Sequence, residues 1–598
     1  MLKRFSKLLK TAMAKFSISK EGVWYTRYYK SINVDNSVLL IDNCMSISDN
    51  PQMLKELCNN KNYKALKKYM TASDVKSAKF NSNIETVKPF SKKHLKLLAG
   101  AKYIISDELP NFYIKKEQQV YINIGSGVNI HNLSSQQRNC LISSYIACQN
   151  QQEFDLIKDR FMLGNLFNGI YLITQNPLDA LSFAMNGEQN GVIAVDGNSC
   201  SNNRKNVLIF TGALDKNGIT TALKNLMNYV GTERNYIPFF YEKAVMPNRE
   251  SINDLGGKDY ICVSGDMDMT LTETIVLALY FLNIAPLRII QKMLDGIYER
   301  EIKRCFGSAR FDYVIHFTGY ARNVFQLISR LDAKKFVWVH NNMFLEAKTK
   351  GNVHISTIKY GYEKCDKIVV VRDTMRQELT EYVGSQQRNK IAVVHNINDI
   401  DLTVKKSLMP VEFQGDTYCS VSLDELNRIL ENKKINKFIN IARFSKEKGA
   451  ERLLSAFDKY RAECDEDAYL IIIGGYGEEF EHIKAIVDDM QNIILIKSIM
   501  NPYPILAKCD LFVLSSYYEG LPMTIIEALM LDVSVISTDI TGPREFLSTG
   551  YGRLVEDSEQ GLIDGMKEFN KTRLSGSVKF DAEEFNRVAL EEFNMLFK

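Results

Sequence analysis

The chain has 598 residues, of which 45% are hydrophobic and 24% charged, so long disordered regions are excluded. Its 75 basic and 71 acidic residues give a net charge of only +4, which excludes a dedicated nucleic-acid binder because such proteins carry a strong basic excess. The 11 cysteines are scattered and no signal peptide is visible, so we expect a cytoplasmic protein with reduced thiols.

The first 20 residues are basic and carry apolar side chains from Leu2 to Phe16 near helical spacing, with no acid before Glu21. Such a segment fits a helix that lies on the anionic inner surface of a membrane. A frayed basic terminus fits the same residues equally well. We therefore treat 1–29 as a basic amphipathic segment and keep both interpretations: peripheral contact with the inner membrane surface through residues 1–20, or a frayed terminus.

Strand-like and helix-like segments alternate along the remaining chain, which predicts an α/β fold with parallel sheets. We divide it into a first α/β domain at 30–200, an N-terminal lobe at 205–400 and a C-terminal lobe at 401–598. The polar stretch 196–204 is the predicted linker, and an amphipathic helix at 581–597 is predicted to pack back across the lobes.

The predicted strands follow each block in chain order. They are 37–41, 102–105, 120–124 and 191–195 in the first block; 206–210, 260–263, 313–316, 336–340, 367–371 and 391–395 in the second; and 437–441, 469–473, 493–496, 511–514 and 533–537 in the third.

The loop and helix after the predicted strand 511–514 carry the most informative residues. Pro522 suits the first turn of a helix, because its missing N–H has no partner to lose there. The free backbone N–H groups of Gly520, Leu521 and Met523, together with the helix dipole, favour a phosphate or the oxygens of a sugar.

Two carboxylates flank this helix start. Glu519 comes just before the helix and Glu527 lies in its second turn, so the pair can bracket a nucleotide sugar, one on the sugar and one on the ribose. The alternative places Glu527 on a solvent-facing stripe with Thr524. Its apolar neighbours disfavour this, because an unpartnered charge in such a run is costly to bury.

These residues form the pattern S-x-Y-E-G-L-P-x-x-x-x-E-A-L, which resembles the signature of the retaining GT-B glycosyltransferases (glycosyl transferases group 1). Three further stretches resemble motifs of that family in the same order: 440–449, with Ala442 in place of the usual glycine, 469–479 and 539–545. The resemblance covers about 205–570 and implies two Rossmann-like lobes that face a cleft.

The resemblance implies that Arg443 and Lys448 clamp the donor diphosphate. Two cations at a strand-to-helix junction can neutralise a leaving diphosphate, although a solvated first helical turn is the simpler interpretation of both residues without the family context. It also implies that Glu527 holds the ribose hydroxyls. Glu519 and the amides from Gly520 to Met523 would hold the donor sugar and phosphate.

In the second block, Gly218 stands in the loop where members of the family bring the backbone close to the diphosphate. His340 matches a strand-end histidine that contacts the donor sugar and helps to organise the reaction, whereas a lone strand-end histidine is otherwise structural. The stretch 393–399 resembles the turn before the domain crossover, and we interpret its Asn396 as structural.

The resemblance implies a reaction that retains the configuration of the sugar, with the leaving phosphate helping to deprotonate the acceptor. It implies no metal and no cofactor besides the nucleotide-sugar co-substrate. The pair Asp266 and Asp268 mimics the D-x-D metal motif of the other glycosyltransferase fold. Matches of three residues are common by chance, so we assign no metal site there.

Residues 101–123 resemble the N-terminal lobe of CDP-glycerol glycerophosphotransferases, and this similarity covers about 90–185. Those enzymes continue with W-H-G-T-P, where the histidine is the expected base. Here the chain places Ser126 at the position of that histidine, and the second lobe with its CDP-binding motifs is missing. We therefore predict that this domain has lost catalysis and serves in acceptor binding or docking.

The sequence thus predicts a three-lobed hexosyltransferase that moves a hexose or N-acetylhexosamine from a UDP sugar onto a cell-envelope glycopolymer such as teichoic acid or capsule polysaccharide. One alternative is a glycerol- or ribitol-phosphate transferase, against which Ser126 counts. Another is a non-catalytic scaffold of envelope assembly. The intact set of acids and cations described above counts against that scaffold.

Overall fold

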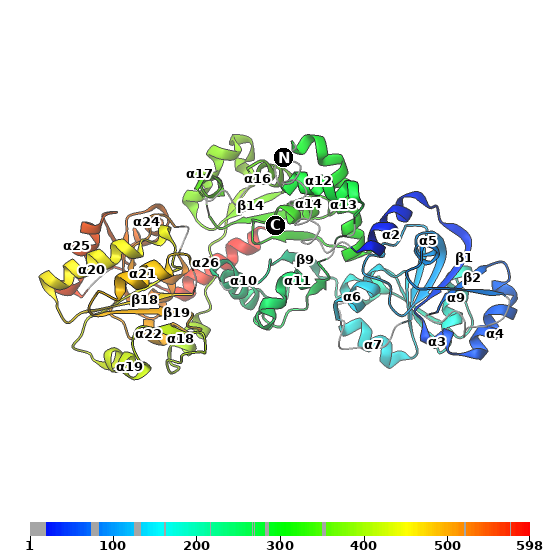
Figure 1. Ribbon diagram of the computed structural model, residues 1–598, viewed down its shortest axis with the longest axis horizontal. Helices are drawn as coiled ribbons and strands as arrows, with labels where there is room; N and C mark the ends of the chain where they lie inside the picture. Colours follow the sequence, from blue (N-terminus) through cyan, green and yellow to red (C-terminus); the bar gives the residue numbers. More distant parts are fainter. Residues whose placement is uncertain are drawn as a thin grey trace. The chain divides into compact units, whose positions relative to one another are not determined.

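Three sheets with helices on their faces make up the computed structural model, which confirms the predicted α/β class (Figure 1). The structure describes residues 19–72, 83–124, 133–160, 163–215, 217–265, 267, 269–281, 286–341, 343–349, 355–475, 477–519, 522–573 and 576–598. Within these ranges, no helix is both long and apolar enough to cross a membrane.

The chain divides into two compact units. The first holds Met1–Asp215, Gly231–Val337 and His354–Asp366, and the second holds Lys216–Val230, Trp338–Val353 and Lys367–Lys598.

The first sheet has eight strands in the order β3-β2-β1-β4-β5-β6-β7-β8, and only the pair β7 and β8 is antiparallel. The predicted strands at 37–41, 102–105, 120–124 and 191–195 correspond to β1, β4, β5 and β8, whereas the other four were not predicted. The strands are β1 (Asp35–Asp42), β2 (Lys67–Thr71), β3 (Ile84–Val87), β4 (Ala101–Ser106), β5 (Val120–Asn123), β6 (Tyr145–Cys148), β7 (Ile170–Ile173) and β8 (Ile193–Asp196).

Alternate residues of β1 supply the two cores of this sheet, because successive side chains of a strand point to opposite faces. Val38 and Leu40 pack with residues of α2 and α5, and Leu39 and Ile41 pack with residues of α4, η1 and α9. The helices are α2 (Lys20–Ser31), α3 (Met45–Ser48), α4 (Pro51–Asn59), η1 (Lys61–Tyr63), α5 (Lys92–Gly100), α6 (Leu133–Ile142), α7 (Gln151–Arg160), α8 (Leu163–Leu166), α9 (Pro177–Asn186) and η3 (Gly197–Cys200).

The second sheet has seven strands in the order β11-β10-β9-β12-β13-β14-β15, and β9 pairs in parallel with both β10 and β12. All six predicted strands are present, and β10 is an additional one. The strands are β9 (Lys205–Phe210), β10 (Arg234–Tyr241), β11 (Ile261–Val263), β12 (Tyr313–His316), β13 (Lys334–Val339), β14 (Lys367–Val370) and β15 (Ile391–Val393). The helices are α10 (Gly218–Tyr229), α11 (Glu242–Val245), η4 (Met246–Ile252), α12 (Leu271–Phe281), α13 (Leu287–Phe306), α14 (Arg322–Ile328), α15 (Met343–Thr349), α16 (Ile355–Lys364), α17 (Asp373–Val383) and η5 (Ser385–Lys390).

The third sheet has the order β16-β19-β18-β17-β20-β21-β22 and is parallel except where β16 pairs with β19. All five predicted strands are confirmed. The strands are β16 (Tyr418–Cys419), β17 (Lys437–Ile441), β18 (Tyr469–Gly474), β19 (Ile493–Lys497), β20 (Leu511–Leu514), β21 (Ser534–Thr538) and β22 (Arg553–Val555). The helices are α18 (Ile400–Ser407), α19 (Leu423–Glu431), η6 (Lys446–Lys448), α20 (Ala450–Cys464), α21 (Phe480–Val487), α22 (Tyr503–Leu506), α23 (Met523–Met530), α24 (Thr541–Leu547), α25 (Glu559–Thr572) and α26 (Ala582–Met595).

The predicted terminal helix is present as α26, and it contacts the turn that follows β15. Asn586 accepts a hydrogen bond of 2.9 Å from the backbone N–H of Asn398, and Glu592 lies 3.0 Å from Nδ1 of His395. The helix therefore ties the end of the chain to a strand of the second sheet.

Candidate functional site

The order of the third sheet creates a switch point at β17. The chain first adds β18 and β19 on one side of this strand and then crosses to add β20, β21 and β22 on the other. In open α/β sheets, ligands bind beyond the carboxyl ends of the strands at such a point. We therefore expect a binding site at the loops after β17, β18 and β20, which carry Arg443, Lys448 and Glu519.

The loops after β17 and β20 are in backbone contact at Gly449. This residue has a left-handed φ of +64°, and a Cβ atom there would lie 2.2 Å from the carbonyl oxygen of Ser515. Ser515 Oγ donates a hydrogen bond of 3.0 Å to the carbonyl of Lys448, and the Tyr517 N–H donates one of 2.8 Å to the carbonyl of Glu447. Only glycine permits this approach.

A second glycine brings in the loop after β18. Gly477 has a φ of +146°, and a Cβ atom there would lie 1.9 Å from the carbonyl oxygen of Phe444. That same oxygen accepts a hydrogen bond of 3.0 Å from the N–H of Glu479. All three loops of the switch point are therefore packed backbone against backbone.

Lys448 and Glu519, which lie 71 positions apart in the chain, form an ion pair in this region. Their side chains are only 14% and 12% exposed, and Ser516 Oγ donates a hydrogen bond of 3.0 Å to the Glu519 carboxylate. Partial burial strengthens such a pair relative to an exposed one. The structure thus brings together one predicted cation and one predicted acid.

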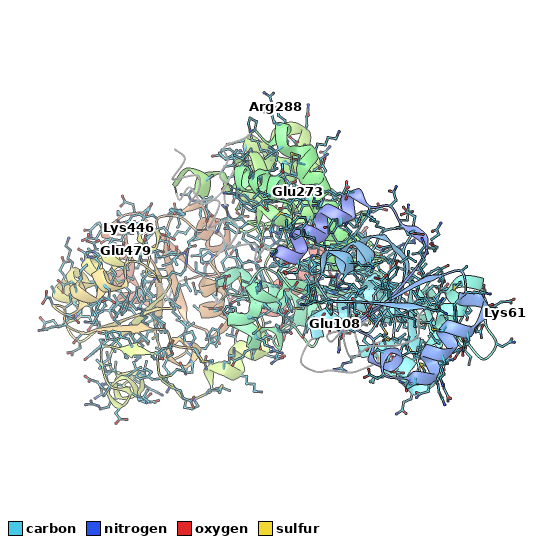
Figure 2. The ribbon with its side chains drawn as sticks, turned by 45° about the vertical axis from the view of Figure 1, so that its right-hand side comes forward. Lys61, Glu108, Glu273, Arg288, Lys446 and Glu479 are labelled. Carbon is cyan, nitrogen blue, oxygen red and sulfur yellow. The ribbon has the colours of Figure 1, made fainter. Side chains whose placement is uncertain are left out.

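Arg443 lies in the loop after β17 and pairs with Glu447 at 3.0 Å. It lines a pocket of about 560 Å³ whose walls come from all three loops. Lys446 and Glu479, labelled in Figure 2, lie 4.0 Å apart beside this pocket. The lining residues are Arg443, Ser445, Lys446, Glu447, Gly477, Glu478, Tyr517 and Tyr518.

Arg452 holds the loop after β20 in place, a role that the sequence analysis missed. Its guanidinium donates hydrogen bonds of 2.7 Å to the carbonyls of both Ser515 and Ser516. It also stacks 4.0 Å from the centre of the Tyr517 ring and pairs with Asp557 at 2.8 Å. The only sequence signal is a cation one helical turn after Lys448.

Glu527 contacts a residue outside this group. Its carboxylate accepts a hydrogen bond of 3.1 Å from the hydroxyl of Tyr503, at the start of α22. Burial raises the pKa of Glu527 to about 7, although the Tyr503 hydrogen bond and the charge of Lys406 lower it. Glu527 and Thr524 are both half-buried, so the structure does not decide between the two interpretations of Glu527, and its role toward a ribose stays a prediction.

The start of the helix after Glu519 is partly described. Gly520 and Leu521 lie outside the described residues. Pro522 immediately precedes the first residue of α23, Met523, rather than lying in its first turn, and no side chain caps this end. The predicted binding role of these amides stays a prediction.

The structure places the two predicted residues of the second block at the start of a helix and directly after a strand. Gly218 is the first residue of α10, and no atom lies within 4 Å of where its Cβ would be. His340 follows β13 directly and is 7% exposed. Asp266, Asp268 and Ser126 lie outside the described residues, as do residues 1–18 of the predicted membrane segment.

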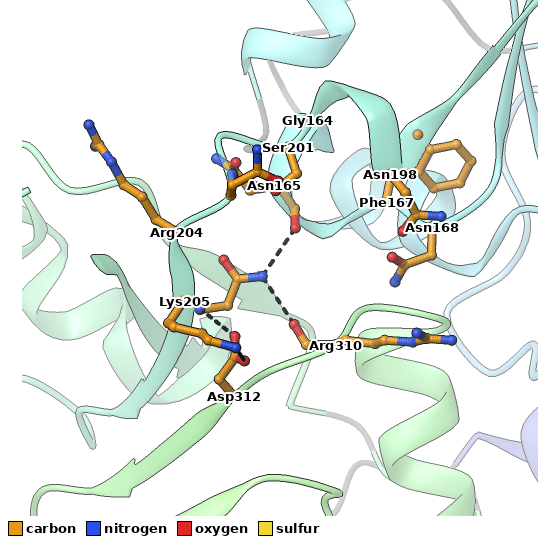
Figure 3. Close-up of a pocket in the computed structure, with 13 residues that line it drawn as sticks. Gly164, Asn165, Phe167, Asn168, Asn198, Ser201, Arg204, Lys205, Arg310 and Asp312 are labelled. Carbon is orange, nitrogen blue, oxygen red and sulfur yellow. Dashed lines mark hydrogen bonds and ion pairs between the residues drawn. The ribbon is translucent and has the colours of Figure 1, made fainter. Parts of the chain in front are cut away.

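A smaller, polar pocket of about 200 Å³ lies in the first unit, at the start of β9 and β12 (Figure 3). The side-chain amide of Asn206 donates hydrogen bonds of 3.1 Å and 3.2 Å to the carbonyls of Asn165 and Arg310. Lys205 pairs with Asp312 at 2.8 Å. Because these polar groups already bind one another, we interpret this pocket as a structural joint.

One group of side chains in the described ranges has the spacing of metal ligands, namely Asp373, His395 and Glu545, whose ligand atoms lie within 4.8 Å of one another. Glu545 already accepts a hydrogen bond of 3.1 Å from the N–H of Thr374, and His395 binds Glu592. We therefore interpret this group as a joint between α17, α24 and α26.

The stretch of the chain that carries Arg443, Lys448 and Glu519 is similar to a known family. Residues 423–576 match glycosyl transferases group 1. The predicted resemblance is confirmed for this glycosyltransferase segment. Residues 24–186 match a second family, CDP-glycerol:poly(glycerophosphate) glycerophosphotransferase, which confirms the resemblance predicted for the first domain over a longer range.

Curated relatives are glycosyltransferases from several organisms. An uncharacterized glycosyltransferase of Methanocaldococcus jannaschii is 33% identical over 36% of this chain and 51% of its own length. The capsular polysaccharide biosynthesis glycosyltransferase CapH of Staphylococcus aureus is 27% identical over 31% of this chain and 52% of its own. The chain therefore spans about half the length of these relatives.

Among solved structures, HepE of Anabaena, in complex with UDP and glucose, is similar with a TM-score of 0.46 and 11% identity, over 66% of this chain and 100% of that one.

Proposed function

We propose that the protein is a retaining glycosyltransferase that moves a hexose or N-acetylhexosamine from a UDP sugar onto a cell-envelope glycopolymer. One observation carries this proposal: the loops after β17, β18 and β20 line one pocket that includes Arg443, and the loops after β17 and β20 also hold the ion pair of Lys448 with Glu519. A pocket of about 560 Å³ has the size typical of small-molecule sites.

Arg443 and Lys448 supply the positive charge that binding of a diphosphate requires. Arg443 and Lys448 lie at the junction of β17 and α20, and each is paired with a carboxylate. A diphosphate bound there would compete with Glu519 for Lys448, because charge-assisted hydrogen bonds to phosphate are strong. The carboxylate released from Lys448 would then accept hydrogen bonds from the hydroxyls of the donor sugar.

The reaction that we propose exchanges one bond at the anomeric carbon for another on the same face. The bond from this carbon to the diphosphate oxygen breaks, and a bond to the acceptor oxygen forms. The acceptor proton passes to the leaving phosphate, whose charge the two cations stabilise. In this scheme His340 and Glu519 contact the sugar, Glu527 binds the ribose, and no metal takes part.

The acceptor that we propose is a phosphate-containing polymer at the inner face of the cell membrane, such as teichoic acid or capsule polysaccharide. Two findings support it: the match of residues 24–186 to a family that acts on poly(glycerophosphate), and relatives named for capsule biosynthesis. The first domain would then bind the acceptor while the C-terminal segment binds the donor.

A donor screen tests the proposal. Purified protein is incubated with UDP-glucose, UDP-galactose, UDP-N-acetylglucosamine and CDP-glycerol, and release of UDP or CMP is measured. We expect UDP release from one of the three UDP sugars and none from CDP-glycerol. Release of CMP alone would instead support glycerol-phosphate transfer, for which the match of the first domain is the favouring observation.

A further inference from the structure

One face of the first domain combines aromatic rings with cations. Helices α2 and α5 pack side by side on the same face of the first sheet (Figure 1). Their outward side chains form a surface that we name the α2–α5 face. It consists of Lys20, Trp24, Arg27 and Tyr28 of α2, Phe90 before α5, and Lys92 and Lys96 of α5.

The rings and cations of this face contact one another. The ammonium of Lys92 lies 5.1 Å from the centre of the Trp24 ring, and that of Lys96 lies 5.6 Å from the Tyr28 ring. Trp24 and Tyr28 stack 6.1 Å apart, and Arg27 lies 5.7 Å from Trp24. Arg27, Lys92 and Lys96 are thereby held next to amphipathic rings instead of next to carboxylates.

The cations of the face outnumber the acids of its two helices. Among the described residues, Lys20, Arg27, Lys92 and Lys96 form no ion pair; helix α5 contains no acidic residue, and α2 contains Glu21 in its first turn. The adjacent Lys93 differs, because it pairs with Glu85. The four cations of the α2–α5 face are therefore available to an external anion.

The aromatic part of the face is unusual for this chain. The protein has two tryptophans, and the other one, Trp338, is 2% exposed in the core, whereas Trp24 is partly exposed. Phe90, at the edge of the face, is 53% exposed. Tryptophan and tyrosine concentrate at membrane–water interfaces, where an apolar ring and a polar tip are both satisfied.

We propose that the α2–α5 face docks on an anionic lipid bilayer. Each lysine or arginine close to such a surface contributes about 1 kcal/mol of attraction, and the exposed rings favour a bilayer over a soluble polyanion because they gain apolar contact in the headgroup region. The chain next to the face has the same character: residues 1–18 hold five cations and no acid and lead directly to Ser19, which caps α2.

The test measures binding of the full chain to vesicles by sedimentation. Vesicles contain phosphatidylcholine alone or mixed with phosphatidylglycerol. The test variant is Lys92→Gln with Lys96→Gln. The matched control is Lys61→Gln with Lys64→Gln, which removes the same charge from exposed residues beside η1, on the opposite face of the first sheet (Lys61 is labelled in Figure 2).

We expect the wild type to bind only the anionic vesicles, the control to match it, and the test variant to bind about 30-fold more weakly, as the loss of two lysines requires. Equal binding of the test variant and the wild type would overturn the proposal and assign any binding to residues 1–18. Retention on soluble polyphosphate without vesicle binding would also overturn it, in favour of a polymer partner.

Tryptophan fluorescence provides a second measurement that does not depend on charge. Anionic vesicles should shift the emission of the wild type to the blue, because Trp24 enters a less polar environment while Trp338 stays buried. The Trp24→Phe variant should show no shift. A shift that survives in this variant, or its absence in bound wild type, would contradict docking through this face. Neither measurement depends on sugar transfer, so their outcome is independent of the proposed function.

Discussion

At the scale of single residues, Glu527 links the fold to the proposed donor. The half-buried Glu527 accepts a hydrogen bond from Tyr503, and burial raises its pKa to about 7 from a usual value of 4.5. Only the ionised form accepts hydrogen bonds from both ribose hydroxyls at full strength. The affinity of the protein for a uridine nucleotide should therefore depend on the protonation of this one residue.

We predict that wild-type affinity for UDP rises as the pH increases through about 7, by up to about tenfold per pH unit below that value. The Glu527→Gln variant should bind more weakly at pH 8 and lose this dependence, and Glu527→Ala should abolish UDP release with the fold intact. Isothermal titration calorimetry from pH 5.5 to pH 8.5 checks the prediction. Parallel pH curves for wild type and Glu527→Gln would count against a ribose contact.

Gly449 carries a second prediction at this scale. The Gly449→Ala variant combines a left-handed φ with a clash against the Ser515 carbonyl, whereas Gly187→Ala has a left-handed φ of +81° and no atom near the new Cβ. We expect Gly187→Ala to lower the free energy of unfolding by about 1 kcal/mol and Gly449→Ala by at least about 2 kcal/mol. Urea denaturation compares the two. Equal losses of unfolding free energy in the two variants would mean that the loops after β17 and β20 move apart at little energetic cost.

How far the site could be predicted is also clearest residue by residue. The sequence identified Arg443, Lys448 and Glu519, because each lies in a local motif. It did not predict the ion pair between Lys448 and Glu519, since residues 71 positions apart meet only through the order of the strands. Arg452 was missed for the same reason. Its partners are backbone carbonyls of another loop, and because every residue has a backbone carbonyl, such contacts produce no sequence pattern.

At the scale of elements, the second sheet was predicted best, with six of its seven strands, whereas the short strands β16 and β22 of the third sheet were missed. Strand β10 was missed: it lies between β9 and β11 but contains Pro238, which cannot donate to the ladder and normally argues against an interior strand. Strands β2 and β3 are short and half-polar, and their burial comes from neighbours that the local pattern does not reveal.

The joint between α26 and the turn after β15 gives a prediction for an element. Burial lowers the pKa of His395, but the hydrogen bond and charge of Glu592, with Asp373 and Glu545, outweigh it and raise the pKa above 6.5. A raised histidine pKa stabilises the fold below about pH 6.5, and this stabilisation is lost as the pH rises through the raised value.

Wild type should therefore lose stability relative to His395→Gln as the pH rises above about 6.5 and through the raised pKa, and Glu592→Gln should weaken the same dependence. Chemical denaturation at several pH values, followed by circular dichroism, provides the measurement. A stability difference that stays constant across this range would show that the imidazole carries no charge at the joint.

At the scale of the whole molecule, the two compact units differ in what they contain. The pocket with Arg443 and the ion pair of Lys448 with Glu519 belong entirely to the second unit, whereas the α2–α5 face belongs to the first. Chains built from separate units commonly unfold in more than one step. A ligand stabilises only the unit that binds it.

We expect calorimetry to show two unfolding transitions, and we expect UDP to raise the transition temperature of only one of them. At a UDP concentration 100 times the dissociation constant, the free energy of unfolding of the unit that binds UDP should rise by about 2.7 kcal/mol. The double variant Arg443→Ala with Lys448→Ala should show the same two transitions without the UDP effect. Equal displacement of both transitions by UDP would mean that the units unfold together or that the nucleotide binds elsewhere.

The clamp that Arg452 forms has a consequence for how a donor is received. Its guanidinium fixes two successive carbonyls of the loop after β20 and is itself fixed by Asp557, so the part of this loop next to Tyr517, which lines the pocket, is held in place without a ligand. If the proposed donor binds here, little backbone entropy of this part of the loop is lost on association, and we expect selectivity between donors to come from the fit of a preorganised cavity.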